Sequence, residues 1–251
     1  MPKIIISGCN GHMGRVIEAL CAADPNIQVV AGFDVLGTQE HVFPVYSSPA
    51  LFSGQADAVI DFSAPAALNG LLEFAVARKT PLVLATTGYT PEHVAQIGIT
   101  AREVPLFRSA NMSLGINVLL SLVQKAASVL GDGYDIEIVE RHHHRKVDAP
   151  SGTAMMIADV AAQACGHPTE YVYDRSTVRR SRDKKEIGIS AVRGGTIVGE
   201  HEIIFAGHDE VIEIKHTALS REIFAQGAVA AAKFMATVTA PGLYNMSHVI
   251  D

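Results

Sequence analysis

Short apolar runs alternate with amphipathic segments through the first 110 residues of the chain. Residues 3–7 (KIIIS), 27–33 (IQVVAGF) and 57–62 (DAVIDF) are almost continuously hydrophobic, as are the strands of a parallel sheet that is covered on both faces. The runs 81–86 (PLVLAT) and 104–109 (VPLFRS) repeat the pattern. Together the runs predict a buried parallel sheet.

The segments between these runs have the periodicity of helices. In the first segment, apolar side chains occupy positions i, i+3, i+4 and i+7, at Met13, Val16, Ile17 and Leu20. This spacing indicates a helix with one buried face. Residues 65–79 predict another helix, with Ser63 as its N-cap shortly before a proline. Strands that alternate with helices indicate a Rossmann-like, doubly wound α/β sheet.

The second part of the chain has a different pattern. Residues 114–131 predict a long helix, 134–140 a strand and 151–165 a further helix. Three strand candidates follow within 186–218, separated by Gly-Gly and Gly-His-Asp turns, and such short connections indicate antiparallel or mixed pairing. This pattern predicts a second α+β domain with a mixed or antiparallel sheet. A last helix is expected after Ala218, and the pattern leaves open on which domain it packs.

Composition narrows the class of protein. The chain has 251 residues, 48% of them hydrophobic, and a formal net charge of -6. A sequence pI near 6.0 argues against nucleic acid as a partner, because nucleic-acid binders carry a strongly positive surface. No uncharged apolar run reaches the ~18 residues of a membrane span, and the N-terminus lacks a signal-peptide pattern. The three cysteines fit neither a disulfide framework nor a zinc knuckle, so we expect a cytoplasmic protein.

A glycine-rich loop follows the first predicted strand. Gly8, Gly11 and Gly14 are spaced G-x-x-G-x-x-G, whereas the usual dinucleotide fingerprint is G-x-G-x-x-G. The loop joins a buried strand to a helix, whose N-terminal N–H groups can hold a pyrophosphate. Asp34 ends the second strand, where a carboxylate can bind the adenosine ribose. A tight turn without a ligand is the alternative interpretation.

The cofactor prediction favours NADH over NADPH. Val35 follows Asp34, and no lysine or arginine occurs between Val35 and Arg78. Nothing nearby in the sequence therefore pairs with a 2′-phosphate. A cation that folds in from elsewhere would reverse this preference.

Residues 140–154, ERHHHRKVDAPSGTA, gather cations in a chain of negative net charge. Alternation along an extended chain would direct His142 and His144 to one side. The other side would receive Arg141, His143 and Arg145. Because adjacent strand residues converge poorly on one ion, a three-histidine metal site is disfavoured. A solvated surface run is a second alternative.

An anion pocket explains this stretch better. Ser151 to Thr153 begin a predicted helix whose free N–H groups attract anions, and Lys146 lies five residues upstream of Ser151. Together they suit a small dianionic substrate. A histidine beside such a pocket can exchange protons near neutral pH, as reduction of a conjugated C=C–C=N system requires once hydride has arrived. One imidazole would then handle a proton, and the remaining cations would hold carboxylates.

Several motifs together resemble one known family. In order, they are SGCNGHMGR, ATTGYT, SANMSLGINV, IEIVERHHHRKVDAPSGTA, RGGTIVGEHEIIFAG and SREIFAQGAVAAA. In sequence and approximate spacing they are similar to bacterial dihydrodipicolinate reductase, now called 4-hydroxy-tetrahydrodipicolinate reductase. The resemblance runs from the first strand to the GLYNM near the end of the chain.

The resemblance implies a homotetrameric NAD(P)H-dependent reductase of the diaminopimelate route to lysine. Residues 1–113 with 219–251 would form the dinucleotide-binding domain, and 114–218 the substrate-binding and oligomerisation domain. By motif, His142 would be the acid/base and Lys146 a proton donor or carboxylate ligand. The substrate would be held by His143, Gly152 and Thr153. The cofactor would contact Gly8, Cys9, Asn10, Gly11, His12, Met13, Asp34, Ala85, Thr86, Thr87, Ser109, Ala110, Asn111 and Met112.

Two features depart from the family pattern, and two other functions remain open. Val35 stands where many members carry a basic residue, and the loop 178–186 is unusually basic. That loop is interpreted as a solvated mobile segment, or else as a cover for the substrate. A catalytically silent NAD(P)-binding regulatory protein of the same fold is one alternative function. A metal-dependent hydrolase that uses His142 to His144 is the other.

Overall fold

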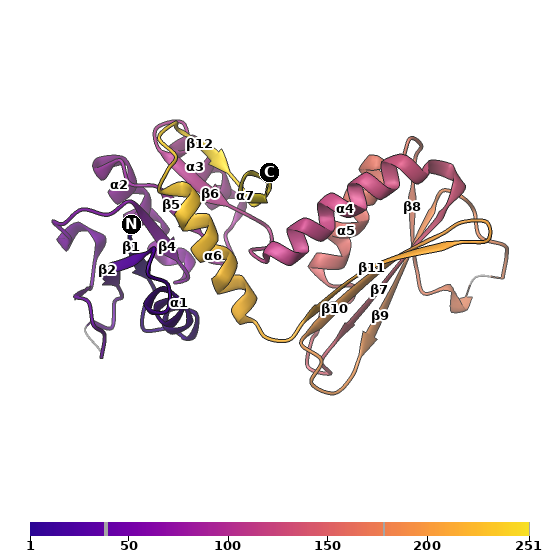
Figure 1. Ribbon diagram of the computed structural model, residues 1–251, viewed down its shortest axis with the longest axis horizontal. Helices are drawn as coiled ribbons and strands as arrows, with labels where there is room; N and C mark the ends of the chain where they lie inside the picture. The colour runs from indigo at the N-terminus through magenta and orange to yellow at the C-terminus, as the bar shows by residue number, and fades with distance from the viewer. Residues whose placement is uncertain (38–39, 178, 251) are drawn as a thin grey trace. The chain divides into compact units, whose positions relative to one another are not determined.

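The chain forms two compact units in the computed structural model, which describes residues 1–37, 40–177 and 179–250. The first unit consists of Met1–Leu114 with Glu222–Asp251, and the second of Gly115–Arg221 (Figure 1). The chain therefore leaves the first unit after residue 114 and returns to it at residue 222.

A seven-stranded parallel sheet forms the centre of the first unit, in the order β12-β6-β5-β4-β1-β2-β3. Its strands are β1 (Lys3–Ser7), β2 (Gln28–Phe33), β3 (Val45–Tyr46), β4 (Ala58–Asp61), β5 (Leu82–Leu84), β6 (Pro105–Arg108) and β12 (Gly242–Tyr244). Its helices are α1 (His12–Ala22), α2 (Leu68–Arg78), α3 (Pro91–Thr100), α6 (Glu222–Met235) and α7 (Ser247–Ile250). The prediction of a Rossmann-like parallel sheet is confirmed.

Hydrophobic cores cover both faces of this sheet, which explains why its strands lack polar alternation. Ile4 and Ile6 pack in one core with side chains of α1 and α6. Ile5 and Val59 pack in another core with the apolar face of α2. Since successive strand residues point to opposite faces, each apolar run supplies both cores.

The start of α2 differs from the prediction. Ser63 was expected to cap this helix, but Pro65–Ala67 form a 3-10 turn and α2 begins only at Leu68. The Ser63 hydroxyl instead donates a hydrogen bond to the Asp61 carboxylate at 2.5 Å. The predicted N-cap is wrong because the chain first makes the 3-10 turn, so that Ala64 precedes that turn and Ala67 is the N-cap of α2.

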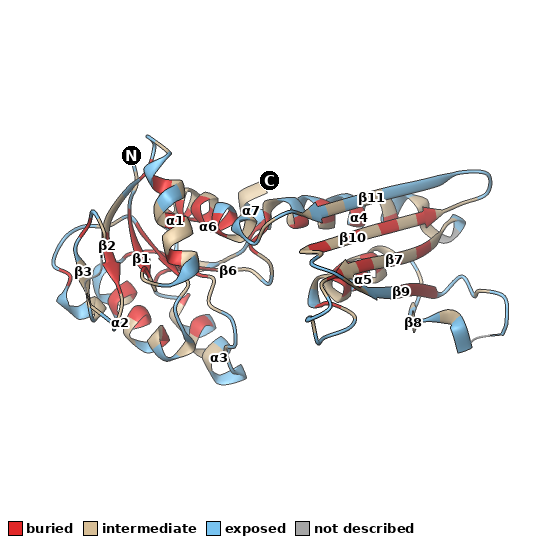
Figure 2. Cartoon of the chain, turned by 90° about the horizontal axis from the view of Figure 1, so that it is seen from below, coloured by how far each residue is buried: buried red, intermediate tan, exposed pale blue. Residues whose placement is uncertain are grey.

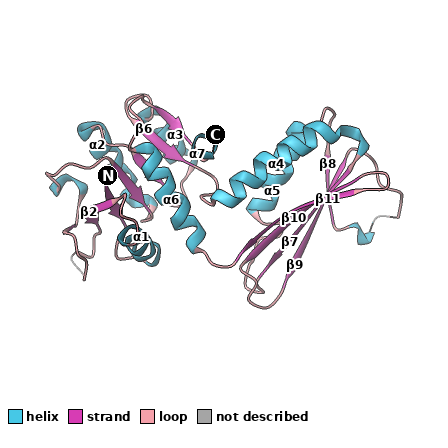
Figure 3. Ribbon diagram, viewed as in Figure 1, coloured by secondary structure: helices cyan, strands magenta, loops and turns pink. Residues whose placement is uncertain are grey.

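The second unit has a five-stranded mixed sheet in the order β11-β10-β7-β9-β8. Strand β7 pairs in parallel with β9 and antiparallel with β10, which confirms the mixed sheet. The strands are β7 (Asp135–His142), β8 (Glu170–Tyr173), β9 (Glu186–Arg193), β10 (Gly199–Ala206) and β11 (Val211–Ala218). The helices are α4 (Leu114–Leu130) and α5 (Gly152–Ala164), and Figure 3 shows them along the sheet.

Both helices cover the same face of this sheet. Val123 of α4 and Ile157 of α5 share one core with Ile138, Ile189 and Phe205 from three strands. The residues that alternate with these core positions along β7 and β10 are only partly buried (Figure 2). The sheet therefore has one covered and one uncovered face.

Candidate functional site

The glycine loop after β1 needs glycine at two positions. Gly8 has φ +78°, and a Cβ there would stand 2.7 Å from the Phe62 carbonyl oxygen. A Cβ on Gly14 would stand 2.3 Å from the Gly8 carbonyl oxygen. Helix α1 begins directly behind this loop, with Gly11 at the N-cap and no side-chain cap. The loop and the helix N-terminus thus present uncapped backbone N–H groups in a tight cradle, which fits a pyrophosphate.

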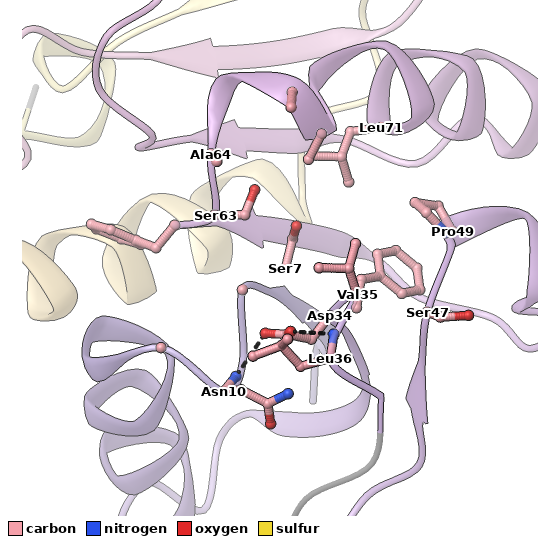
Figure 4. A pocket seen from close by; sticks show the side chains of 16 residues that line it. Ser7, Asn10, Asp34, Val35, Leu36, Ser47, Pro49, Ser63, Ala64 and Leu71 are labelled. Atoms are coloured by element: carbon pink, nitrogen blue, oxygen red, sulfur yellow. Dashed lines mark hydrogen bonds between the residues drawn. The ribbon is translucent and has the colours of Figure 1, made fainter.

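Asp34 is fixed next to this loop. One carboxylate oxygen accepts a hydrogen bond from the Asn10 backbone N–H at 3.1 Å, and the other accepts one from Leu36 N–H at 3.1 Å. Both bonds appear in Figure 4. The carboxylate borders a cavity of about 580 Å³ that Val35 also lines. No lysine or arginine is among the described residues that line it.

The remaining predicted cofactor residues lie at the same edge of the sheet. Ser7 of β1 is in register with Phe33 of β2 and with Asp61 of β4. Asp61 is in turn in register with Leu84 of β5, and Leu84 with Arg108 of β6. Because all these strands are parallel, the residues after each of them emerge along one edge. The loops after β5 and β6 carry Ala85, Thr86, Thr87, Ser109, Ala110, Asn111 and Met112.

The side chains within the glycine motif differ in their exposure. Cys9 and Met112 are buried, and burial raises the pKa of the Cys9 thiol to about 11. His12 is exposed at the start of α1, and Met13 is half-buried. Cys9 and Met112 therefore offer a ligand backbone groups rather than side chains.

His142 is the last residue of β7 and is 8% exposed. Its Nδ1 lies 2.6 Å from an Oε of Glu140, which precedes it by two residues. The strand ends here, because Lys146 N–H bonds the His143 carbonyl in a turn. The predicted alternation of His142 with His144 is therefore wrong, since His144 lies in this turn rather than in the strand.

The N-terminus of α5 follows the same turn. Ser151 is its N-cap, and the Ser151 hydroxyl accepts a hydrogen bond from Ala154 N–H at 3.1 Å. Gly152 and Thr153 are the first helical residues, and the first turn contains no acidic side chain. Upstream, Lys146 Nζ is 2.9 Å from Asp148 Oδ1. The helix end is thus an electropositive feature that suits an anion.

A second cavity, of about 490 Å³, is lined by His143, Arg145, Thr196, Val198 and Arg221. Burial and the charges of Arg145 and Arg221 lower the pKa of His143. The His143 Nδ1 atom is buried without a hydrogen-bond partner among the described residues. A hydroxyl and two guanidinium groups beside a histidine form a pocket for a carboxylate.

Sequence reasoning missed Arg221 and Thr196. Arg221 lies in the SREIF motif, which carries part of the resemblance, and Thr196 lies in the RGGT motif. Neither spacing nor charge pattern connects these residues with His143, which lies more than fifty positions earlier. The pairing of β7 with β9 and β10 brings the loop with Thr196 close to the end of β7. The pairing of β10 with β11 brings the segment after β11, with Arg221, to the same end.

The basic loop before β9 forms ion pairs. Arg182 Nη1 lies 2.8 Å from Glu137, and Arg180 Nη2 lies 2.5 Å from the buried Glu186. Glu186 begins β9, whereas the other end of β9 is in register with His142. Within the second unit, the described part of this loop therefore lies at the end of the sheet opposite His142. Val178, the first residue of the predicted loop, lies outside the described residues.

Metal sites, disulfide bonds and membrane spans were each considered for the part of the chain that the structure describes. It contains no group of three or more histidine, cysteine or acidic side chains that could hold a metal ion. Cys9, Cys21 and Cys165 form no disulfide bond. No described helix is long and apolar enough to cross a membrane.

A glycine-rich loop and a fixed carboxylate at the carboxyl edge of a parallel sheet define a nucleotide-binding domain. Beside it in the chain, a second domain carries a histidine, a helix N-terminus and a cation-lined cavity. This combination defines the class of two-domain nucleotide-dependent oxidoreductases.

The chain belongs to the dihydrodipicolinate reductase family. Residues 2–112 match the family model "Dihydrodipicolinate reductase, N-terminus", and residues 115–250 match "Dihydrodipicolinate reductase, C-terminus". A 4-hydroxy-tetrahydrodipicolinate reductase from Caldanaerobacter subterraneus subsp. tengcongensis is 53% identical over 250 residues, which cover 100% of this chain and 98% of the relative. The reductase of Clostridium tetani is 47% identical, with 100% and 98% covered. The resemblance inferred from the motifs is confirmed.

Solved structures show the same fold at low identity. The dipicolinate-bound dihydrodipicolinate reductase from Paenisporosarcina sp. TG-14 has a TM-score of 0.81 at 22% identity, over 98% of this chain and 97% of that one. The C. glutamicum DAP dehydrogenase, solved in complex with DAP, has a TM-score of 0.60 at 14% identity, over 100% and 95%. These likenesses establish the two-domain architecture.

Proposed function

We propose that the protein reduces 4-hydroxy-tetrahydrodipicolinate, through dihydrodipicolinate, to tetrahydrodipicolinate in lysine and diaminopimelate biosynthesis. Full-length relatives at 53% and 47% identity carry this activity in their names. The observation that carries the proposal is the cluster on the second unit, where His142 lies at a strand end beside a cation-lined cavity and a helix N-terminus.

The cofactor is a reduced pyridine nucleotide, with NADH favoured over NADPH. Gly8 and Gly14 let the loop and α1 pack closely, because a Cβ at either position would clash with a backbone carbonyl. The N–H groups at the start of α1 then bind the pyrophosphate, and Asp34 offers its carboxylate to the ribose hydroxyls. Val35 brings no charge for a 2′-phosphate, and the described lining of the adjoining cavity is free of lysine and arginine. When bound, the reduced nicotinamide supplies the hydride for C4 of the unsaturated ring.

The substrate is a dicarboxylate held on the second unit. The Gly152 and Thr153 amides at the start of α5 bind one carboxylate. His143, together with the guanidinium groups of Arg145 and Arg221, binds the other. Both anchors rely on cations and N–H groups, so the sites select for a dianion.

Proton transfer is the task of His142, with Lys146 as a second donor or a carboxylate ligand. The enamine that remains after hydride addition requires a proton, and an imidazole can deliver it near neutral pH. General acid catalysis of this kind contributes about 10²- to 10⁴-fold to the rate.

The native assembly is proposed to be a homotetramer built on the uncovered face of the mixed sheet. That face exposes Val192 and Val211 among charged side chains. Arg141 and Glu202 pair across it at 2.8 Å. An apolar and charged face of this kind suits burial against a second copy. Three cysteines without a disulfide bond suit a reducing compartment, so the proposed location is the cytoplasm.

Absorbance of the reduced nicotinamide tests the proposal. The purified protein is mixed with the condensation product of pyruvate and aspartate semialdehyde, first with NADH and then with NADPH. We expect turnover with NADH, and a loss of kcat in His142→Ala without loss of NADH affinity. Cofactor binding without turnover would support a silent regulatory protein, and hydrolysis that a chelator abolishes would support a metallohydrolase.

A further inference from the structure

Glu140 is a fully buried carboxylate that the proposed chemistry does not yet use. It lies two residues before His142 in β7, so both side chains point to the same face of the sheet. Its Oε2 lies 2.6 Å from His142 Nδ1. A buried acid beside the proposed proton donor requires an explanation, because burying an unpaired charge is costly.

Four donors converge on this carboxylate. Arg193 of β9 binds it in a bidentate manner, from Nη1 to Oε2 and from Nη2 to Oε1, each at 2.7 Å. The Ser151 backbone N–H donates to Oε1 at 3.0 Å, and His142 is the fourth donor. An ionised carboxylate only accepts hydrogen bonds, so His142 Nδ1 carries a proton and Nε2 is left for exchange.

The charges around Glu140 keep it ionised. Burial by itself raises the pKa of Glu140, but hydrogen bonds from Arg193 and His142 outweigh it and hold that pKa below the usual value. Asp148 contributes its backbone carbonyl to Arg193 at 2.6 Å, which fixes the guanidinium from its other side. The guanidinium therefore acts as a permanent counter-charge.

The surroundings of the imidazole leave Nε2 accessible. A Cβ on Gly199 of β10 would stand 3.1 Å from His142 Nε2, so glycine keeps the space in front of this nitrogen open. His201 of the same strand contacts the ring edge-on, with centroids 5.2 Å apart. Burial lowers the pKa of His201 to about 4, so its neutral ring adds no charge at neutral pH. On the connecting turn, Lys146 forms an ion pair with Asp148 at 2.9 Å, and Arg145 lines the cavity beside His143.

We propose that Glu140 is a positioning residue for proton transfer, which fixes the His142 imidazole with Nδ1–H toward the carboxylate and Nε2 toward the substrate. Arg193 holds Glu140 ionised and in place. This inference rests on the proposed role of His142. It rests on geometry, since residues i and i+2 of one strand share a face of the sheet.

Kinetics of Glu140→Gln provide the first test. An amide in place of the carboxylate turns an NH₂ group toward Arg193 or His142, both of which are donors. We expect kcat to fall about 10- to 100-fold, the usual effect of losing such an orienting partner, with little change in KM or NADH affinity. Glu137→Gln is the matched control, because Glu137 lies in the same strand and pairs with Arg182 away from His142. The kcat of Glu137→Gln should stay within about twofold of the parent value, a much smaller change than the loss expected for Glu140→Gln.

The double variant distinguishes the two proposals. If Glu140 acts through His142, Glu140→Gln adds no further loss to His142→Ala. Full turnover in His142→Ala would overturn the proposed function itself. An inactive His142→Ala with a fully active Glu140→Gln would overturn only the positioning role, as would additive losses in the double variant.

Nitrogen-15 spectra of the parent protein test the geometry in the intact network. His142→Ala identifies the His142 signals by difference in histidine-labelled protein. We expect the neutral ring to carry its proton on Nδ1, whereas a proton on Nε2 with a bare Nδ1 would refute the proposal. This measurement decides the matter even where Glu140→Gln fails to fold.

Discussion

Asp61 is the buried carboxylate at the carboxyl end of the central strand β4, and it connects two loops of the nucleotide-binding unit. It is 0% exposed. Its Oδ1 accepts hydrogen bonds from Ser63 N–H at 3.2 Å and from the Ser63 hydroxyl at 2.5 Å. Its Oδ2 accepts from the Thr86 hydroxyl at 2.7 Å and the Tyr89 hydroxyl at 3.2 Å. We predict that Asp61→Ala destabilises the fold and loosens the loop that carries Thr86.

The size of the stability loss follows from the hydrogen-bond donors that Asp61→Ala would leave without their acceptor. A hydrogen bond to a charged group contributes about 1.5–3 kcal/mol. The three hydroxyls can rotate toward other acceptors, whereas the Ser63 N–H cannot, so the net loss is expected to equal about two such bonds, or roughly 3–6 kcal/mol. In Asp61→Asn the amide oxygen can keep the Ser63 donors, and its NH₂ can donate to the hydroxyls of Thr86 and Tyr89. That variant should lose only about 1 kcal/mol.

Urea unfolding followed by circular dichroism measures these differences, and fluorescence titration with NADH measures the effect on the loop. We expect Asp61→Ala to unfold at clearly lower urea and to bind NADH more weakly, with Asp61→Asn close to the parent. Asp57→Ala is the control, because the exposed Asp57 also accepts a backbone bond, from Lys3 N–H at 2.7 Å. Equal urea midpoints for Asp61→Ala and Asp57→Ala would refute the reasoning.

Three further predictions concern other parts of the two units. Gly14→Ala should weaken NADH binding and lower the urea midpoint, because its Cβ would stand 2.3 Å from the Gly8 carbonyl oxygen; an unchanged dissociation constant would contradict this. Val35→Arg should raise the NADPH/NADH ratio of kcat/KM about 10-fold or more through a charged hydrogen bond to the 2′-phosphate, as steady-state rates with each cofactor would show. Burial lowers the pKa of His201 to about 4, so the unfolded chain binds a proton there that the folded chain does not, and stability falls as the pH drops from about 6.5 to about 4. His201→Gln should lack this loss, of about 3 kcal/mol in total, when urea midpoints at pH 7.5 and 4.5 are compared, and equal pH sensitivity of both proteins would count against it.

The pattern of hydrophobic residues predicted the main strands of the parallel sheet, because a strand buried on both faces leaves a continuous apolar run. It missed β3 and β12, of two and three residues, whose side chains are mostly half-buried at the edges of the sheet. It also missed β8, which lies in a polar stretch and pairs only with β9. Edge strands bury one side at most, so their sequences carry little of the signal that identifies interior strands.

The functional residues also divide into those with a local sequence signal and those that only the pairing of strands brings together. Gly8 and Asp34 are recognisable in the sequence, because a strand, a turn and a helix N-terminus fix their geometry locally. The Glu140–His142 pair also has a local signal, since residues i and i+2 of a strand share a face, but counting cations in this stretch directs attention away from Glu140. Arg193 has no local signal, because its bond to Glu140 spans 53 positions. Only the parallel register of β7 with β9, which aligns His142 with Arg193, turns a distant arginine into the counter-charge that a buried glutamate needs. Local motifs therefore indicate which residues can react, whereas the pairing of strands determines which charges surround them.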